Sequence, residues 1–280
     1  MSRAAGPLPS PAYLVASRQG IYAVDHHRWR LLVAGQFFGI VCAGGDIFAF
    51  RHGAAGDSVD PNSGCVVHYV WLNERLVEQG VVVSSLDHNV HQLEHIDGTF
   101  FLVDTLDQSI REYDAAWQPR ATHAILPPAP RDGPNHAHVN SVAGTADAVW
   151  VMLHNGVRKQ SSEIIEYDRD FNERGRTVLP CSACHDIVPL SDGRLMTCLS
   201  PHGALLVGAD EVHPIDELWT RGLVFGCDEI AVGSSLYGQR LGRKLLPGFL
   251  TFLDHSFRRI GRIYVPAAPT QIRPLPFDAF

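Results

Sequence analysis

The most constraining feature of this sequence is a repeat that places a histidine at the same point of three successive units. His138 follows His91 by 47 residues, and His185 follows His138 by the same interval. Each unit consists of short β-type runs that are divided by turn signals such as Asp97-Gly98. Because a period of roughly 20–50 residues is typical of propellers and solenoids, the repeat predicts one of these architectures.

The unit that begins at His91 predicts a four-stranded meander. Its expected strands are residues 91–96, 99–104, 109–114 and 120–126. Further units of the same kind begin near the following residues: Phe38, His138, His185 and Arg221. No stretch of twelve or more residues has the apolar spacing of an amphipathic helix. We therefore expect an all-β fold.

The two ends of the sequence complement each other. Residues 12–35 supply three strands and lack the first strand of a unit, whereas residues 270–276 supply one strand with no partners. Propellers close their ring by building one blade from both termini. The sequence thus predicts a β-propeller, with six four-stranded blades closed by the N- and C-terminal strands. Five or seven blades, or a β-sandwich, are the alternatives.

We expect one propeller domain over residues 1–280, with residues 1–11 as a flexible N-terminal tail. The repeat pattern resembles the six-bladed propellers of the gluconolactonase and NHL-repeat type across essentially the whole chain. This resemblance implies architecture only. Those lactonases bind metal through acidic and asparagine ligands, which find no match here, so their activity does not transfer.

The first strand of each propeller blade lines the central channel. Aligning the units on their turns puts six residues at equivalent channel positions: Phe38, His91, His138, His185, Arg221 and Gln271. Imidazole is the commonest transition-metal ligand, and three protein ligands leave positions open for catalysis. We therefore expect His91, His138 and His185 to bind one divalent transition metal ion. A metal-free polar channel is the alternative.

The loops after the second strands should open on the same face and supply other groups of the site. The expected catalytic residues are His154, Tyr237 and Asp104, and the expected substrate-binding residues are Arg221, Arg240, Gln271 and Asn155. Arg221 would stand at the channel position itself, where a charge needs a partner or a ligand. It could hold a substrate carboxylate or phosphate, or pair with Asp186 or Asp228.

A Cys-x-x-Cys-His motif formed by Cys181, Cys184 and His185 competes with this interpretation. The motif is the attachment site of c-type haem, but the repeat already explains His185 as a channel residue. The cysteine pair could also be a redox dithiol or a soft-metal site. A zinc- or ferredoxin-type site would need a second cysteine pair, and the sequence has none.

Three function classes fit the predicted site. The favoured one is a non-haem iron (or copper) oxidoreductase or oxygenase that acts on a small polar molecule. It is similar to propeller carotenoid-cleaving oxygenases, which differ in having four histidines and seven blades. The second is a zinc- or manganese-dependent hydrolase or lyase, in which the metal acts as a Lewis acid or activates water. The third is a non-catalytic propeller that binds a ligand or a protein. Fe(II) is the favoured metal, with Cu, Zn or Mn as alternatives.

Composition limits the partners. The net charge of −7 comes without a basic patch, which argues against nucleic acid. No run approaches the ~18 apolar residues that span a bilayer, and residues 1–11 lack the apolar segment of a secretory signal. We therefore expect a cytoplasmic protein with reduced cysteines, a small-molecule partner and no membrane partner. The sequence carries no signal of oligomeric state.

Overall fold

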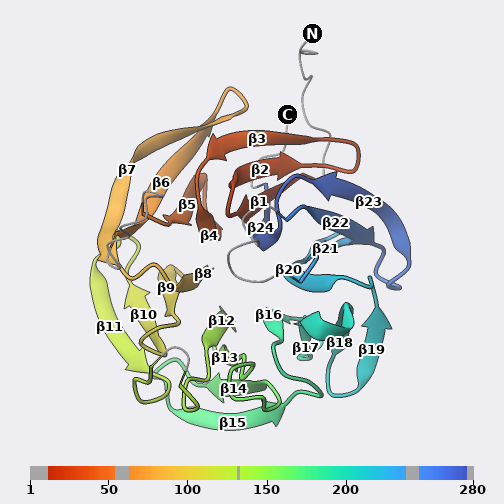
Figure 1. Ribbon diagram of the computed structural model, residues 1–280. Coiled ribbons are helices and arrows are strands. Elements are labelled where there is room, and N and C mark those ends of the chain that lie inside the picture. Colours follow the sequence, from red (N-terminus) through yellow and green to blue (C-terminus); the bar gives the residue numbers. More distant parts are fainter. Residues whose placement is uncertain (1–11, 54–62, 131–132, 238–245, 276–280) are drawn as a thin grey trace.

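The fold is a ring of six four-stranded antiparallel sheets around a common centre, as the computed structural model shows (Figure 1). The innermost strands surround this centre, which is called the channel below. The structure describes residues 12–53, 63–130, 133–237 and 246–275. Within these residues the six blades confirm the predicted all-β propeller and its blade number. The predicted N-terminal tail, residues 1–11, lies outside the described residues.

Five of the blades, numbered II to VI, each consist of four consecutive strands. Blades II and III contain β4 (Phe37–Ala43), β5 (Asp46–Arg51), β6 (Gly64–Leu72), β7 (Arg75–Leu86), and β8 (Val90–Ile96), β9 (Thr99–Asp104), β10 (Ser109–Tyr113), β11 (Pro119–Ala124). Blades IV and V contain β12 (Val139–Gly144), β13 (Val149–Leu153), β14 (Glu163–Tyr167), β15 (Glu173–Val178), and β16 (His185–Pro189), β17 (Leu195–Leu199), β18 (Ala204–Val207), β19 (Glu211–Pro214). Blade VI contains β20 (Trp219–Phe225), β21 (Ile230–Ser235), β22 (Gly248–Leu253) and β23 (Arg259–Val265). A short 3-10 helix, η1 (Ser200–His202), follows β17.

Blade I closes the ring by joining the two ends of the chain. Its order is β24 (Pro269–Pro274), β1 (Tyr13–Ser17), β2 (Gly20–Val24), β3 (Trp29–Ala34). The C-terminal strand β24 is the channel strand, and it pairs antiparallel with β1 through Leu14↔Arg273 and Ala16↔Gln271. The predicted closure by terminal strands is confirmed.

The core lies between the faces of neighbouring blades. Every residue of β9 is buried, whereas every residue of the outer strand β15 is exposed. One apolar cluster joins blade III to blade IV and includes Phe101, Val103 and Val151. Because β-sheets must bury one or both faces, each blade is stable only between its two neighbours.

The turn between the third and fourth strands clamps neighbouring blades on the outside of the ring. In blade IV, Asp168 Oδ1 accepts the N–H groups of Asp170 and Asn172. Phe171 takes a left-handed conformation, with φ of 59°. Its ring stacks on His123 of blade III, with 3.6 Å between centroids. Phe257 of blade VI stacks in the same way on His213 of blade V, also at 3.6 Å.

A β-bulge interrupts the first strand of each of blades II to VI. The register shifts between the following residue pairs: Phe37 and Ile40, Val90 and Leu93, Val139 and Ser141, His185 and Val188, Thr220 and Leu223. A bulge inserts an extra residue and disrupts the ladder hydrogen bonds locally. Backbone N–H groups beside the channel therefore need partners outside their own sheet.

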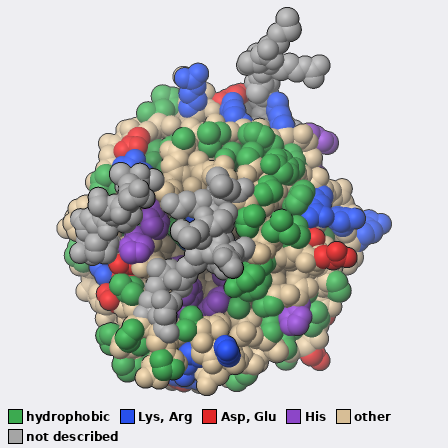
Figure 2. Space-filling model, in the orientation of Figure 1, with side chains coloured by type: hydrophobic (Ala, Val, Ile, Leu, Met, Phe, Trp, Pro, Cys, Tyr) green, Lys and Arg blue, Asp and Glu red, His purple; other side chains and the backbone are tan. Residues whose placement is uncertain are grey.

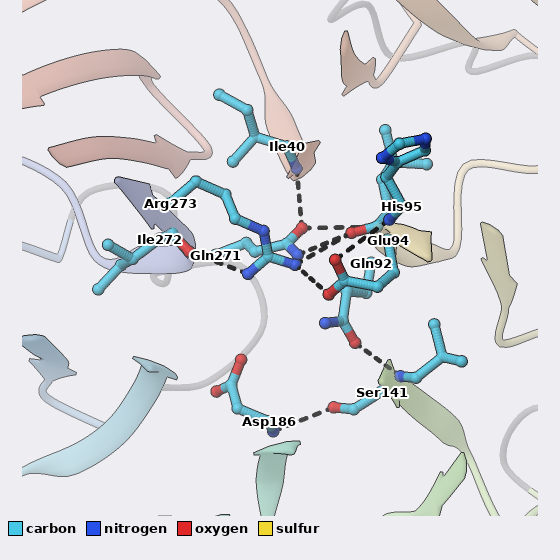
Figure 3. A network of polar contacts seen from close by, with 11 residues as sticks. Ile40, Gln92, Glu94, His95, Ser141, Asp186, Gln271, Ile272 and Arg273 are labelled. Carbon is cyan, nitrogen blue, oxygen red and sulfur yellow. Dashed lines mark hydrogen bonds and ion pairs between the residues drawn. The ribbon is translucent and has the colours of Figure 1, made fainter. Parts of the chain in front are cut away.

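Side chains from neighbouring blades supply those partners around the channel (Figure 3). Gln271 Oε1 of blade I accepts the N–H of Ile40 at 2.8 Å and, more weakly, that of Leu93 at 3.4 Å. Gln92 Oε1 of blade III accepts the N–H of Val142 in blade IV at 2.8 Å.

The same pattern continues through the remaining blades. Ser141 Oγ accepts the N–H of Asp186 at 3.0 Å, and Asp186 Oδ2 accepts that of Gly222 at 2.8 Å. Arg221 Nε of blade VI donates to the Thr270 carbonyl of blade I at 3.2 Å. Together, Gln271, Gln92, Ser141, Asp186 and Arg221 form a channel ring of hydrogen bonds that runs through all six blades.

We predict that Gln92→Ala lowers the free energy of unfolding by about 1–3 kcal/mol, because it leaves the buried N–H of Val142 without its acceptor. Chemical denaturation would measure this loss. Gln79→Ala is the matched control, because the Gln79 side chain is exposed and bonds only its local backbone; we expect a change within about 0.5 kcal/mol. Equal stability of the two variants would contradict the structural role of the channel ring.

Candidate functional site

Four imidazole rings form a continuous row at one end of the channel. The centroids of His91 and His138 are 4.6 Å apart, those of His138 and His154 4.8 Å, and those of His154 and His185 4.9 Å. These four residues, called the imidazole row below, come from blades III, IV and V. The structure thus brings the three sequence-predicted metal ligands together, with the predicted catalytic residue His154 between two of them.

Hydrogen bonds fix the tautomer of His91. Its Nδ1 lies 2.9 Å from the Asn89 carbonyl and 2.8 Å from Thr105 Oγ1. Because the Thr105 hydroxyl donates its proton to the Val139 carbonyl at 2.6 Å, both neighbours of Nδ1 act as acceptors. His91 therefore carries its proton on Nδ1 and presents the lone pair of Nε2 to His138.

His138 reaches the row from a different backbone position than the repeat suggested. Val90 pairs with Asp104 and Val139 pairs with Leu153, in each case the last residue of the second strand. By this register Asn140, rather than His138, occupies the position of His91. His138 stands just before β12 in a left-handed conformation, with φ of 62°, and its Nε2 lies 3.1 Å from His91 Nε2.

His185 has the same kind of support as His91. Its Nδ1 lies 2.9 Å from Ser200 Oγ, and the backbone of Ala183 also hydrogen-bonds the ring. Thr105 and Ser200 each follow the last residue of the second strand of their blade, and His154 follows the corresponding residue in blade IV. The repeat therefore places a hydroxyl, an imidazole and a hydroxyl at one position in three successive blades.

Burial keeps two rings of the row, those of His138 and His185, uncharged. Burial, reinforced by the neighbouring His91, His154, His185 and His136, holds the pKa of His138 well below its usual value. Burial also lowers the pKa of His185, with a further contribution from the positive charge of Arg221. Both rings are therefore neutral at physiological pH, which is the form that binds metal ions and accepts protons.

Further aromatic rings extend the row along the channel mouth in both directions. On one side the ring of Phe38 lies 5.5 Å from His91 and 5.5 Å from His52. On the other, Trp219 lies 6.0 Å from His185 and is stacked with Tyr237 at 4.6 Å. Histidine side chains reach the surface near the centre of this face (Figure 2). The mouth is thus lined by flat rings from blades II to VI.

Two guanidinium groups stand at the Phe38 end of the mouth. Arg18 Cζ lies 4.7 Å and Arg221 Cζ 5.8 Å from the centre of the Phe38 ring. The charge of Arg221 also acts on Asp186, whose pKa burial nevertheless raises. These two guanidinium groups bring positive charge to the Phe38 end of the mouth.

The other predicted site residues have defined places. Asp104 is buried and forms an ion pair with Arg111 in its own blade. Asn155 donates to the Ser161 carbonyl and accepts from Arg158, so its amide organises its own loop. Gln271 belongs to the channel ring, and Tyr237 is exposed at the mouth. Arg240 lies outside the described residues.

The spacing of the imidazole nitrogens bears on metal binding. The 3.1 Å separation of the Nε2 atoms of His91 and His138 fits two adjacent ligands at metal–nitrogen distances of about 2.0–2.1 Å. In the part of the chain that the structure describes, no group of three or more His, Cys, Asp or Glu side chains is arranged to hold a metal ion. A third imidazole ligand would have to come from rotation of the His185 or His154 ring.

Thr105 and Ser200 contact the imidazoles of His91 and His185 from the loops after the second strands, where the sequence predicts groups of the site. Sequence reasoning gave neither residue a specific role, and it overlooked Arg18. Arg18 meets Phe38 across the boundary of blades I and II, a contact for which no local pattern exists.

Comparisons with known proteins bear on the fold. No family model matches the chain, and no curated protein matches it. It is similar to a chain in the crystal structure of a nidogen/laminin complex, with a TM-score of 0.63 and 8% identity over 94% of this chain and 97% of that one. It is also similar to a glucose dehydrogenase-type oxidoreductase from Thermus thermophilus, with a TM-score of 0.59 and 16% identity over 81% and 88% of the two chains.

A third similar structure is virginiamycin B lyase from Staphylococcus aureus, with a TM-score of 0.52 and 14% identity over 82% of this chain and 70% of that one. At such identities the likeness establishes the propeller fold alone. Among the described residues, no helix has the length and apolar character needed to cross a membrane.

We predict that Thr105→Val weakens the preference of His91 for the Nδ1-protonated tautomer, because one of its two acceptors is lost. Imidazole nitrogen chemical shifts would report the tautomer directly. The Val139 carbonyl also loses its donor, so the free energy of unfolding should fall by about 1–3 kcal/mol. Thr122→Val, on the exposed outer strand β11, is the control and should change neither property. An unchanged His91 tautomer in Thr105→Val would contradict the assigned hydrogen bonds.

Proposed function

We propose that this protein is an enzyme that binds one divalent transition metal ion at the imidazole row and acts there on a small anionic molecule. The observation on which this rests is the His91–His138 pair, whose Nε2 atoms face each other at 3.1 Å. His91 and His138 would supply two ligands, and His185 would supply the third after its ring turns. When bound, the metal would supply Lewis-acid or redox chemistry.

The outer contacts of the row support this proposal. Histidines that bind metals usually donate their other ring nitrogen to a carbonyl or a similar acceptor, which fixes the ring and its tautomer. His91 has this arrangement through Asn89 and Thr105, and Ser200 stands in the same place beside His185. An imidazole-only set of ligands suits iron, copper or zinc.

Positive charge at the mouth supports an anionic substrate. Arg221 lies near enough to the imidazole row for its charge to act on His185. Its planar group can hold a carboxylate or phosphate through two parallel hydrogen bonds. Arg18, whose guanidinium lies 4.7 Å from the centre of the same Phe38 ring, would add attraction for the same anion.

Two reaction classes fit this arrangement. An iron- or copper-dependent oxidoreductase is the first, as the all-imidazole set suggests. A zinc- or manganese-dependent hydrolase or lyase is the second, and one contact favours it. His154 Nδ1 accepts the N–H of Gly156 at 3.2 Å, so the proton of this ring lies on Nε2. His154 could then donate a proton to a leaving group, which hydrolysis and elimination require.

The first test is metal content, measured by elemental analysis on untagged protein and on His138→Ala. We expect near-stoichiometric metal in the wild type and a loss of at least about tenfold in the variant, because one of two converging ligands is gone. His255→Ala is the control, since His255 lies on an exposed turn and stacks on Phe225; it should keep its metal.

The identity of the metal separates the two reaction classes. Iron or copper, with oxygen consumption during screening of small organic acids, would support the oxidoreductase. Zinc or manganese, with turnover in the absence of oxygen, would support the hydrolase or lyase. Protein that binds no metal even after anaerobic reconstitution would overturn the proposal and leave a polar ligand-binding channel.

Anion binding gives a separate prediction. Arg221→Met should weaken the binding of inorganic phosphate and small dicarboxylates by about tenfold, corresponding to about 1.4 kcal/mol, with Arg221→Lys weakened less. Calorimetric titration would measure both. Arg262→Met is the control. Arg262 lies on β23, the outer strand of blade VI, and its guanidinium makes a similar contact with the ring of Phe249. Equal affinities in Arg221→Met and wild type would remove Arg221 from the substrate site.

A further inference from the structure

Two cysteines form a close pair directly before the last histidine of the row. Cys181 is partly exposed, whereas Cys184 is fully buried in the apolar cluster between blades IV and V. Their sulfur atoms lie 3.5 Å apart, and both residues are free thiols. The pair has a reactive and a resolving position: one sulfur reachable from solvent, and a second one behind it.

Hydrogen bonds join this cysteine turn, residues 181–184, to the backbone of the imidazole row. The N–H of Ala183 donates to the His154 carbonyl at 2.7 Å. Ser162 Oγ donates to the same carbonyl at 2.7 Å and accepts the N–H of Cys184 at 3.0 Å. The turn thus holds His154 through two contacts.

The turn also contacts the strand that follows His138. Asn140 Nδ2 donates to the Cys184 carbonyl at 2.9 Å, and the next residue along the chain is His185. A movement of Cys184 would therefore reach His154, His185 and β12 together.

Formation of a disulfide would require such a movement. A disulfide bond is about 2.05 Å long. The two sulfur atoms, now 3.5 Å apart, would therefore have to move closer together. Ala183, between them, already has a left-handed backbone with φ of 62°, a conformation that is unfavourable for alanine. Closing the gap between the sulfurs would therefore act on a turn that is already strained and that is hydrogen-bonded to the backbone of the imidazole row.

We infer that Cys181 and Cys184 are a reversible redox dithiol whose oxidation by a low-molecular-weight disulfide repositions His154 and His185. The inference goes beyond the proposed function and does not require a metal ion. It assigns a modification site to the Cys-x-x-Cys motif, which the repeat leaves unexplained.

The reaction is a thiol–disulfide exchange in two steps. The Cys181 thiolate, having given up its proton to solvent, attacks one sulfur of the small disulfide and displaces a thiolate that takes up a proton. Cys184 then loses its proton and attacks Cys181 Sγ in the mixed disulfide, which releases the second small thiol. The protein pair is oxidised by two electrons, and the small disulfide is reduced to two thiols.

The order of attack follows from exposure. Cys181 is the accessible sulfur, and the hydrogen bond from Cys184 lowers its pKa. Cys184 lies among Met152, Ile164 and Leu199, where a solvent thiolate or disulfide cannot reach it first.

The experiment treats the full-length protein with oxidised glutathione, alkylates the remaining thiols and locates modifications by mass spectrometry. We expect the wild type to lose both thiols as an internal disulfide that dithiothreitol reverses. Cys184→Ser should trap glutathione at Cys181, whereas Cys181→Ser should leave Cys184 as a thiol. Cys227→Ser, at an exposed single cysteine, is the control and should form the internal disulfide like the wild type.

The coupling is read from the imidazole resonances of the oxidised and reduced wild type. The signals of His154 and His185 should shift, whereas those of His123 and His213, which stack on the outer rim, should not. Retention of both thiols under conditions that modify Cys227 would overturn the dithiol. If the two thiols form no disulfide with oxidised glutathione and added zinc protects both of them from alkylation, the dithiol would be overturned in favour of a thiolate metal site. A disulfide that leaves the His154 and His185 signals unmoved would overturn the coupling.

Discussion

The hydrogen bonds of the channel ring are the constraint on which the rest of this propeller depends. The bulges beside the channel disrupt the ladder hydrogen bonds, and side chains from other blades accept the N–H groups of Ile40, Val142, Asp186 and Gly222. Because a buried N–H without an acceptor is costly, no blade can adopt its bulge alone. The same strands carry the site: His91 precedes Gln92, and His185 precedes Asp186. The hydrogen bonds that join the blades therefore also set the positions of the imidazoles.

The blade number and the closure by terminal strands could be predicted because strand lengths and turn signals such as Asp97-Gly98 and Asp192-Gly193 are local features that a single unit already contains. The convergence of His91, His138 and His185 could be predicted as well, but not the reason for it. The extra residue of a bulge is invisible in a hydrophobic pattern, so the register that puts Asn140 opposite His91 was missed. Contacts between blades, such as Arg18 on Phe38, depend on the curvature of the whole ring and have no signal in a single unit.

The electrostatic character of the mouth comes from an unusual division of roles. Burial keeps His138 and His185 uncharged, so the positive charge near the row comes from the guanidinium groups of Arg18 and Arg221. Hydroxyl and carbonyl groups behind the rings select which nitrogen carries a proton. Because the charge of Arg221 acts on His185, an anion held by Arg221 would lie near a neutral imidazole.

The position of β24 has a consequence for the way this chain is made. It is the channel strand of blade I, and it carries Gln271, which bonds the backbone of blades II and III. A ribosome makes it after β1 to β3 and after all five of the other blades, so β1 to β3 lack their innermost partner during the synthesis of those blades. Until then Ile40 and the apolar face of β1 have no cover from the C-terminal strand. Synthesis of this protein therefore includes a period in which a nearly complete ring exposes an open seam, and chaperones that recognise extended apolar segments would find it there.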